Sequence, residues 1–472
     1  MEQRPQRAML TGGSLGVLLC VIVPALLTIG TQTGFWSPAP WPAVGVMILA
    51  GARYAWIIAS ASRHLYEMVL WLFTYVFLGC APFVQQRLGD EIGTTPRLDS
   101  HYVDGAWGIV YAGMLAAVAG SAAGRRVPLE TASSLPAISP RRTAALSLFS
   151  FAMSIIYVWK VGPASLFLNR YAFGAVQETA FPNAVMGALV FGWASMGLLV
   201  ALVGQIQLFR LSTGRAKARW LAGAWVTGIA LAYFNNPLSS PRFMVGTVFL
   251  GGLAAVGGYA TQRRFRAVAG SALVGMLMVF PLLNVFRGST SIGGSGHALS
   301  ALQSGDFDAF AQIVNTVDYV AHEGLTGGRQ LAGVFLFWVP RTVWPDKPFD
   351  TGILLANYKS YGFTNLSAPL WSEFYINFGI AGVVIGFFLV GMMARTLDRK
   401  HHVQLLHHAA PGITGCIFPF YSLLLIRGSL LQAASLFAVA AVAIWWVSAR
   451  SPRGIPDDDP HPLLGSRRRH HA

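Results

Sequence analysis

The sequence predicts an all-α, polytopic integral membrane protein with about twelve transmembrane helices and a long external loop that carries short helices. Of its 472 residues, 54% are hydrophobic and only 11% are charged, less than half of the roughly 25% found in soluble domains. The mean hydropathy is +0.52. Since a helix crosses a bilayer with about 20 apolar residues, these values exclude a soluble enzyme.

Successive apolar runs predict the helices in order. The first run follows Arg4 and Arg7 and has no small-residue cleavage site after it, so we expect a retained helix and not a signal peptide. Together the runs form one transmembrane domain over residues 1–450, and the polar, Pro-rich stretch 451–472 is predicted to be a disordered cytoplasmic tail. The expected helices are 9–30, 41–61, 65–83, 103–123, 144–162, 183–206, 220–236, 242–260, 267–286, 373–394, 412–427 and 429–449.

The net charge of +15 has a topological explanation. Of the 34 Lys and Arg residues, 23 fall in the connections that share a side with both termini, which leaves 11 on the other side. Because cytoplasmic loops collect Lys and Arg, both termini are predicted to be cytoplasmic. Nucleic acid is therefore not an expected partner.

The longest connection, residues 287–372, is predicted to be external and functional, since ordered loops of this size usually bind or cover something. Apolar residues at helical spacing predict an amphipathic helix over Asp306–Glu323, with Asp306 as its N-cap, at the outer membrane interface. The apolar stretch Leu331–Val339 is too short to span and is predicted to be re-entrant or interfacial.

A stiff segment with three prolines, Pro340–Pro348, follows. Trp344 suits the level of the lipid headgroups, and Arg341 and Lys347 supply hydrogen-bond donors for an anionic headgroup. The alternative is an interfacial loop anchored by tryptophan, with cations that extend to the water.

Four further arginines are predicted to lie at outer helix ends, where a planar guanidinium can bind phosphate through two hydrogen bonds. The alternative for each is an arginine that extends to the interface or pairs with a carboxylate. The four are Arg170, Arg242, Arg287 and Arg427.

Two external groups are candidates for a general base. Glu373 begins the tenth predicted helix, although a carboxylate at that position also suits the helix dipole. His322 is the second candidate. The external histidines and the three cysteines have no metal-ligand spacing, and no nucleotide-binding or serine-hydrolase motif is present, so neither a metal nor a cofactor is expected.

Several short motifs resemble those of the Wzy-type O-antigen and capsule repeat-unit polymerases, over about residues 140–395. They are Leu168-Asn169-Arg170, Ser240-Pro241-Arg242-Phe243, Arg287 after the ninth helix, Pro340-Arg341-x-x-Trp344-Pro345-x-Lys347-Pro348 and Glu373-x-Tyr375-x-Asn377-Phe378-Gly379.

The resemblance implies a GT-C-like fold and a metal-independent inverting glycosyltransferase at the outer face of the bacterial cytoplasmic membrane. Such an enzyme transfers a growing glycan from undecaprenyl pyrophosphate onto a lipid-linked repeat unit, beside a flippase and a chain-length regulator. Arg170, Arg242, Arg287 and Arg341, with Lys347, would hold the pyrophosphates, which is sensible because fixed cations stabilise a leaving anion.

Two other functions stay open. A transporter or flippase for lipid-linked oligosaccharide would place charges near the bilayer midplane and show paired broken helices. Here the cations are predicted at outer helix ends, with Lys160 and Arg53 the nearest exceptions. A glycosyltransferase similar to the O-antigen ligases is the other alternative.

Overall fold

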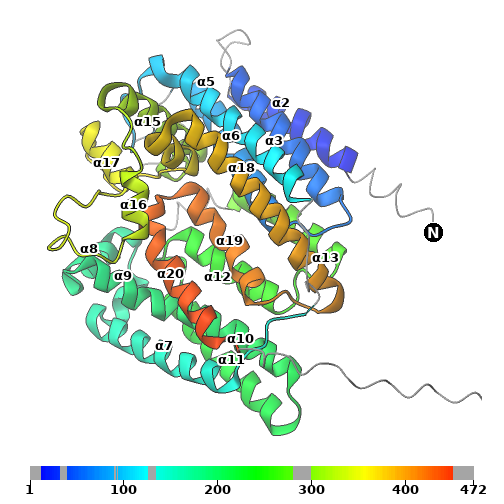
Figure 1. The fold of residues 1–472 in the computed structure, drawn as a ribbon. Helices are drawn as coiled ribbons and strands as arrows, with labels where there is room; N and C mark the ends of the chain where they lie inside the picture. Colours follow the sequence, from blue (N-terminus) through cyan, green and yellow to red (C-terminus); the bar gives the residue numbers. More distant parts are fainter. Residues whose placement is uncertain are drawn as a thin grey trace, which may run out of the picture.

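The protein is a bundle of helices (Figure 1). A computed structural model describes residues 12–31, 40–89, 92, 94–125, 134–279 and 299–449, and these residues form no β-sheet. Within them, eight helical segments are long and apolar enough to cross a membrane. The chain is therefore a helical membrane protein with several candidate spans.

The eight candidate spans combine α-helices with π-helical (η) and 3-10 (η) turns. They are Gly12–Gly30 (with η1, Leu18–Ile22, and α2, Val23–Gly30), α3 (Trp41–Ala59), Leu65–Leu88 (α4, Leu65–Tyr75; η2, Val76–Cys80; α5, Ala81–Leu88), Ser100–Gly124 (η3, Ser100–Tyr102; α6, Val103–Gly124), α7 (Pro140–Val161), Val185–Leu211 (α9, Ala184–Gly192; η5, Trp193–Gly197; α10, Leu198–Leu211), α18 (Leu370–His407) and α20 (Leu430–Val447).

Shorter or more polar helices complete the bundle. They are η4 (Pro163–Phe167), α8 (Arg170–Ala180), α11 (Gly214–Phe234), α12 (Arg242–Ala255), α13 (Gln262–Val274), η6 (Gly275–Val279), η8 (Ser300–Gln303), η9 (Gly305–Phe307), α15 (Ala309–Glu323), α16 (Arg329–Phe335), α17 (Thr351–Tyr358) and α19 (Ile413–Arg427). Within the described residues, each of the twelve predicted segments overlaps a helix; the first is described from residue 12 and the ninth as far as residue 279. Twelve membrane crossings stay a prediction, because in the part of the chain that the structure describes eight segments meet the length and hydropathy that a span requires.

The centre of the bundle is the segment made of α4 and η2, in which every residue is buried. Its sequence is almost continuously apolar and aromatic, as expected of a helix surrounded by other helices. At its start, the carboxylate of Asp398 in α18 accepts hydrogen bonds from the backbone N–H groups of Tyr66 and Glu67, at 2.8 and 3.0 Å. A residue more than 300 positions away thus caps this helix.

Helices α6 and α18 pack closely because glycines face each other's backbone. A methyl group on Gly120 would overlap the backbone oxygen of Phe388, and one on Gly391 would overlap that of Ala117. Small residues allow this close approach between membrane helices.

Helix α18 is longer than the predicted 373–394 and is broken at Gly379, whose φ of 63° and ψ of −153° are not helical. Asn377, just before the break, accepts hydrogen bonds from Thr326 Oγ1 (3.1 Å) and from the backbone N–H of Leu331 (3.2 Å). Asn377 therefore connects both α16 and the loop before it to the first part of α18.

The short helices α15, α16 and α17 gather at one end of the bundle, at the upper left of Figure 1, which we call the loop end. The first part of the predicted stretch Leu331–Val339 lies in the short helix α16. The predicted tail 451–472 lies outside the described residues, as does Arg287.

The prediction for Asp306–Glu323 was wrong in two respects. The helix begins at Ala309, and Asp306 lies in the preceding turn η9, where its carboxylate pairs with Arg242 and does not cap a helix. Its apolar face packs within the protein, with the Phe310 ring stacked 4.0 Å from that of Trp107. Its position at the outer membrane interface stays a prediction.

Candidate functional site

Among the described residues, the predicted site residues lie in separate clusters. Arg242 and Arg427 come together, Arg341 and Lys347 share the Pro-rich loop, and His322 lies in a third cluster. Arg170 is the first residue of α8 and follows Asn169, whose side chain caps that helix.

Arg242 and Arg427 converge on two aspartates. Arg242 Nη1 lies 2.6 Å from Asp306 Oδ2, and Arg427 Nη2 lies 3.5 Å from Asp308 Oδ1 and 2.9 Å from the backbone oxygen of Asp306. Burial raises the pKa of Asp308 above its ordinary value, and the nearby Arg427 only partly opposes this. Of the four arginines that the sequence analysis expected at one site, the structure therefore brings Arg242 and Arg427 together, and carboxylates pair with both, as in the counter-ion alternative.

Arg341 and Lys347 hold the Pro-rich loop together. Arg341 Nη1 donates to the backbone oxygen of Lys347 at 2.6 Å, and its guanidinium lies 4.3 Å from the centre of the Phe349 ring. Lys347 Nζ donates to the backbone oxygens of Phe337 (2.6 Å) and Val339 (3.0 Å), and burial, followed by the nearby Arg341, lowers the pKa of Lys347. Arg341 remains exposed, Trp344 is half-buried and Lys347 is buried.

Glu373 is buried, and both its carboxylate oxygens are engaged. One accepts a hydrogen bond from Thr351 Oγ1 in α17 at 3.0 Å, and the other accepts from the backbone N–H of Leu430 at the start of α20 at 2.9 Å. The side chain is only 2% exposed. Glu373 thus joins three helices, α17, α18 and α20.

His322, the second predicted base, has the opposite environment. Its side chain is 56% exposed, and Nδ1 lies 3.0 Å from Asp318 Oδ1, from the Asp318 backbone oxygen and from the Tyr358 hydroxyl. Lys359 Nζ lies 2.6 Å from Asp318 Oδ2. We call these four residues, Asp318, His322, Tyr358 and Lys359, the His322 cluster.

The electrostatics of the His322 cluster fix its hydrogen positions. Burial opposes ionisation of Asp318, but hydrogen bonds from Lys359 and Tyr358 outweigh burial and lower its pKa. Burial, followed by the hydrogen bond to Asp318, raises the pKa of Tyr358 to about 12, so its hydroxyl keeps its proton. Because Nδ1 of His322 faces only oxygens, the neutral ring carries its hydrogen there, which leaves Nε2 as the acceptor.

A further charged cluster, away from the loop end, was not predicted from the sequence. Arg53 Nη2 lies 2.6 Å from Glu67 Oε1, and Arg395 Nη1 lies 3.2 Å from Glu67 Oε2. Ser121 also donates to this carboxylate. A glutamate and arginines in or beside apolar runs could have indicated this cluster, because ionisable residues in membrane spans are usually functional or paired.

His64, Glu67 and Asp398 are close enough to be considered as metal ligands, with candidate ligand atoms within 4.8 Å of one another. However, Arg395 Nη1 lies 2.7 Å from His64 Nδ1, and both oxygens of Asp398 cap α4. Burial and the neighbouring Arg395 lower the pKa of His64 to about 3, so His64 is neutral and accepts from the guanidinium. The arginine thus fills the position that a cation would need.

No protein-family model, curated protein or solved structure matches this chain. The class of protein is therefore defined by the helices alone, as a helical membrane protein with several candidate spans.

Proposed function

We propose that the protein is a membrane glycosyltransferase that extends lipid-linked glycans at its loop end, at the outer face of the bacterial cytoplasmic membrane, with His322 as the general base. The substrates are two lipid-linked oligosaccharides, and a growing chain moves from undecaprenyl pyrophosphate onto a new repeat unit. A flippase that supplies the repeat unit and a chain-length regulator are the proposed partners.

The geometry of His322 carries this proposal. An exposed imidazole whose Nδ1 is held by a buried carboxylate is the arrangement that directs Nε2 toward a substrate proton. Glu373 lacks this access. We therefore place the base at His322, which sequence reasoning put second, and give Glu373 a role in the fold.

The reaction needs one proton transfer and one substitution. Nε2 of His322 takes the proton of the acceptor hydroxyl, whose oxygen bonds to the anomeric carbon of the growing chain. The bond from that carbon to the pyrophosphate oxygen breaks with its electron pair, and the lipid pyrophosphate leaves. Arg341, which is exposed at the same end, is a candidate to stabilise this anion, as are Arg287 and Arg170.

The test is chain extension by purified protein supplied with synthetic lipid-linked repeat units. We expect His322→Asn to slow extension by about 10²- to 10⁴-fold, the usual contribution of a general base. His101→Asn is a matched control, because His101 is also exposed and lies near Tyr102 at the loop end. Extension by His322→Asn at the rate of the unchanged protein would reject His322 as the base.

A transporter of lipid-linked oligosaccharide is the second candidate, and one observation favours it. Arg53, Glu67 and Arg395 form ion pairs within candidate spans, where ionisable groups commonly mark a transport pathway. Vesicles containing the protein distinguish the two functions. Movement of the lipid-linked oligosaccharide across the bilayer without glycan extension would replace the polymerase with the transporter.

A further inference from the structure

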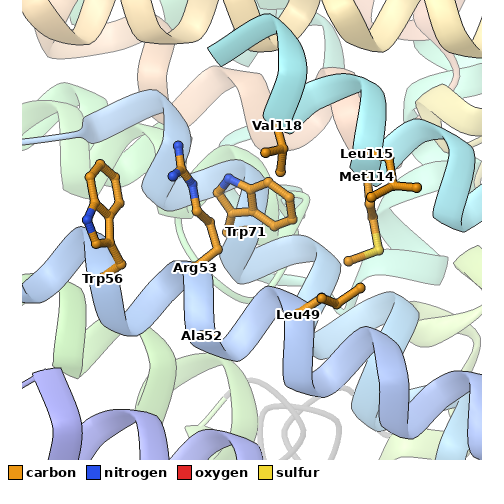
Figure 2. A pocket seen from close by; sticks show the side chains of 8 residues that line it. All are labelled: Leu49, Ala52, Arg53, Trp56, Trp71, Met114, Leu115 and Val118. Atoms are coloured by element: carbon orange, nitrogen blue, oxygen red, sulfur yellow. The ribbon is translucent and has the colours of Figure 1, made fainter. Parts of the chain in front are cut away.

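A groove with apolar walls opens between α3, α4 and α6, toward the end opposite the loop end (Figure 2). Its volume is about 260 Å³, and Arg53 lies between the rings of Trp56 and Trp71 in it. Leu115 on its wall is 63% exposed and Val118 is 42% exposed. Exposed apolar walls on candidate spans are suited to a lipid chain.

Three guanidinium groups surround the Trp56 ring at one end of this groove. The central carbons of the Arg53, Arg125 and Arg395 guanidiniums lie 4.3, 5.5 and 5.6 Å from the ring centre. Stacking on an aromatic ring keeps a guanidinium in place while its N–H groups remain available at the edges.

A second pocket, of about 350 Å³, adjoins these arginines. Its lining includes His64, Arg125, Arg395, Asp398 and Arg399. Trp56 connects the two pockets, because it lines the groove while its ring contacts Arg125 and Arg395 of the second pocket. A polar, cationic space thus continues directly from an apolar one.

The charges around this second pocket do not balance. Three arginines, namely Arg53, Arg125 and Arg395, face two carboxylates, Glu67 and Asp398. Glu67 is shared between Arg53 and Arg395, and Asp398 is occupied by backbone N–H groups. Among the described residues no carboxylate pairs with Arg125, which is exposed. His64 adds no positive charge, because its pKa is lowered to about 3. The pocket therefore has an excess of positive charge that an anion would compensate.

We propose that these two pockets bind one anionic phospholipid, with an acyl chain in the groove beside Leu115 and Val118 and the headgroup phosphate against Arg125 and Arg395. Basic pockets between membrane helices commonly hold anionic headgroups. The site is separate from the His322 cluster and does not depend on the proposed glycosyltransferase activity.

The experiment is native mass spectrometry of the full-length protein in detergent, titrated separately with phosphatidylglycerol, phosphatidylcholine and inorganic phosphate. We expect phosphatidylglycerol to bind at least about fivefold more tightly than phosphatidylcholine, since one arginine near a headgroup contributes about that much. Inorganic phosphate should not compete at equal concentration, because it lacks the chain that fills the groove.

Two variants locate the lipid without removing an ion pair of the fold. Arg125→Gln should weaken phosphatidylglycerol binding about fivefold, and Val118→Trp should weaken it by filling the groove. Arg215→Gln and Val226→Trp are the matched controls, since both positions are exposed on α11, away from these pockets. Arg125→Lys should restore most of the binding, because it keeps the charge.

Three results would overturn the proposal. The first is equal binding of the two lipids, which indicates unspecific lipid contact. The second is binding of inorganic phosphate as tight as that of phosphatidylglycerol, which indicates an ion site. The third is equal loss of binding in the test and control variants, which places the lipid elsewhere on the protein.

Discussion

At the scale of single residues, burial distinguishes the two candidate bases that the sequence presents, the Glu373 carboxylate and the His322 imidazole. Glu373 is surrounded by donors from α17 and α20, whereas His322 points outward and is oriented by Asp318. The same distinction applies to the cations. Lys347 donates to backbone oxygens of its own loop, while Arg341, in the same motif, stays exposed.

Glu373→Gln tests the role assigned to Glu373. The amide oxygen can still accept from the Leu430 N–H, but the amide nitrogen then donates to the Thr351 hydroxyl, and the buried Thr351 O–H loses its acceptor. We expect stability to fall by about 1–3 kcal/mol, the cost of an unsatisfied buried polar group, with extension per folded molecule unchanged. Thermal unfolding in detergent and the extension assay measure both. Unchanged stability with extension abolished would instead return Glu373 to the role of base.

Asp318→Asn tests the ionised state of Asp318. Since hydrogen bonds from Lys359 and Tyr358 lower its folded pKa below the unfolded value of about 3.9, its ionised form stabilises the protein at neutral pH. This stabilisation is fully present above the unfolded pKa and is lost as pH falls through the folded pKa. We expect Asp318→Asn to unfold at a lower temperature at pH 7, with a difference that narrows below about pH 4. Asp99→Asn, at an exposed position, is the control. A difference that widens in acid would contradict the lowered pKa.

At the scale of elements, the breaks in the helices connect the loop end to the bundle. Gly379 interrupts α18 where Asn377 binds Thr326 and Leu331, so two residues of the Glu373–Gly379 motif have a structural role in the fold. Within the described residues, π-helical turns also interrupt helices at η1, η2 and η5. Such turns are frequent at functional sites. In this protein they occur in several separate helices and do not mark a single site.

Gly379→Ala tests whether the break needs glycine. An alanine at a φ of 63° with ψ of −153° is strained, and we expect a loss of about 1–3 kcal/mol in stability. Gly246→Ala is the matched control, because Gly246 lies inside α12 with open space around it and alanine favours a helix. Thermal unfolding of the two variants side by side gives the comparison. Equal stability of both would show that the break tolerates a side chain.

At the scale of the whole molecule, α18 connects two charged regions, with Glu373 near its first residue and Arg395 toward its last. The distribution of Lys and Arg predicts that the loop end is external and that the Arg395 end is cytoplasmic. The proposed activity depends on this orientation, because its substrates are presented at the outer face.

Cysteine labelling checks the orientation. Glu323→Cys and Arg215→Cys place a thiol on exposed positions of α15 and α11, in a Cys20→Ala background in which Cys80 and Cys416 are buried. In intact cells we expect a membrane-impermeant maleimide to label only Glu323→Cys, and to label both proteins after lysis. Labelling of Arg215→Cys alone in intact cells would invert the topology and remove the external site.

The sequence by itself determined the class of protein and the positions of its helices, because apolar runs and their polar boundaries are local properties that need no neighbours. It also singled out His322, Arg242 and Arg427.

The partners of these residues were decided only by the tertiary structure. Asp318 is four residues from His322 in the chain, but Tyr358 and Lys359 come from the end of another helix, α17. Asp306 pairs with Arg242, which is 64 positions away in the sequence. The cluster of Arg53, Glu67 and Arg395 joins residues from three helices, two of them more than 300 positions apart. Whether a charge is neutralised, buried or free to bind depends on such distant neighbours, since electrostatic and desolvation energies follow distance in space and not along the chain.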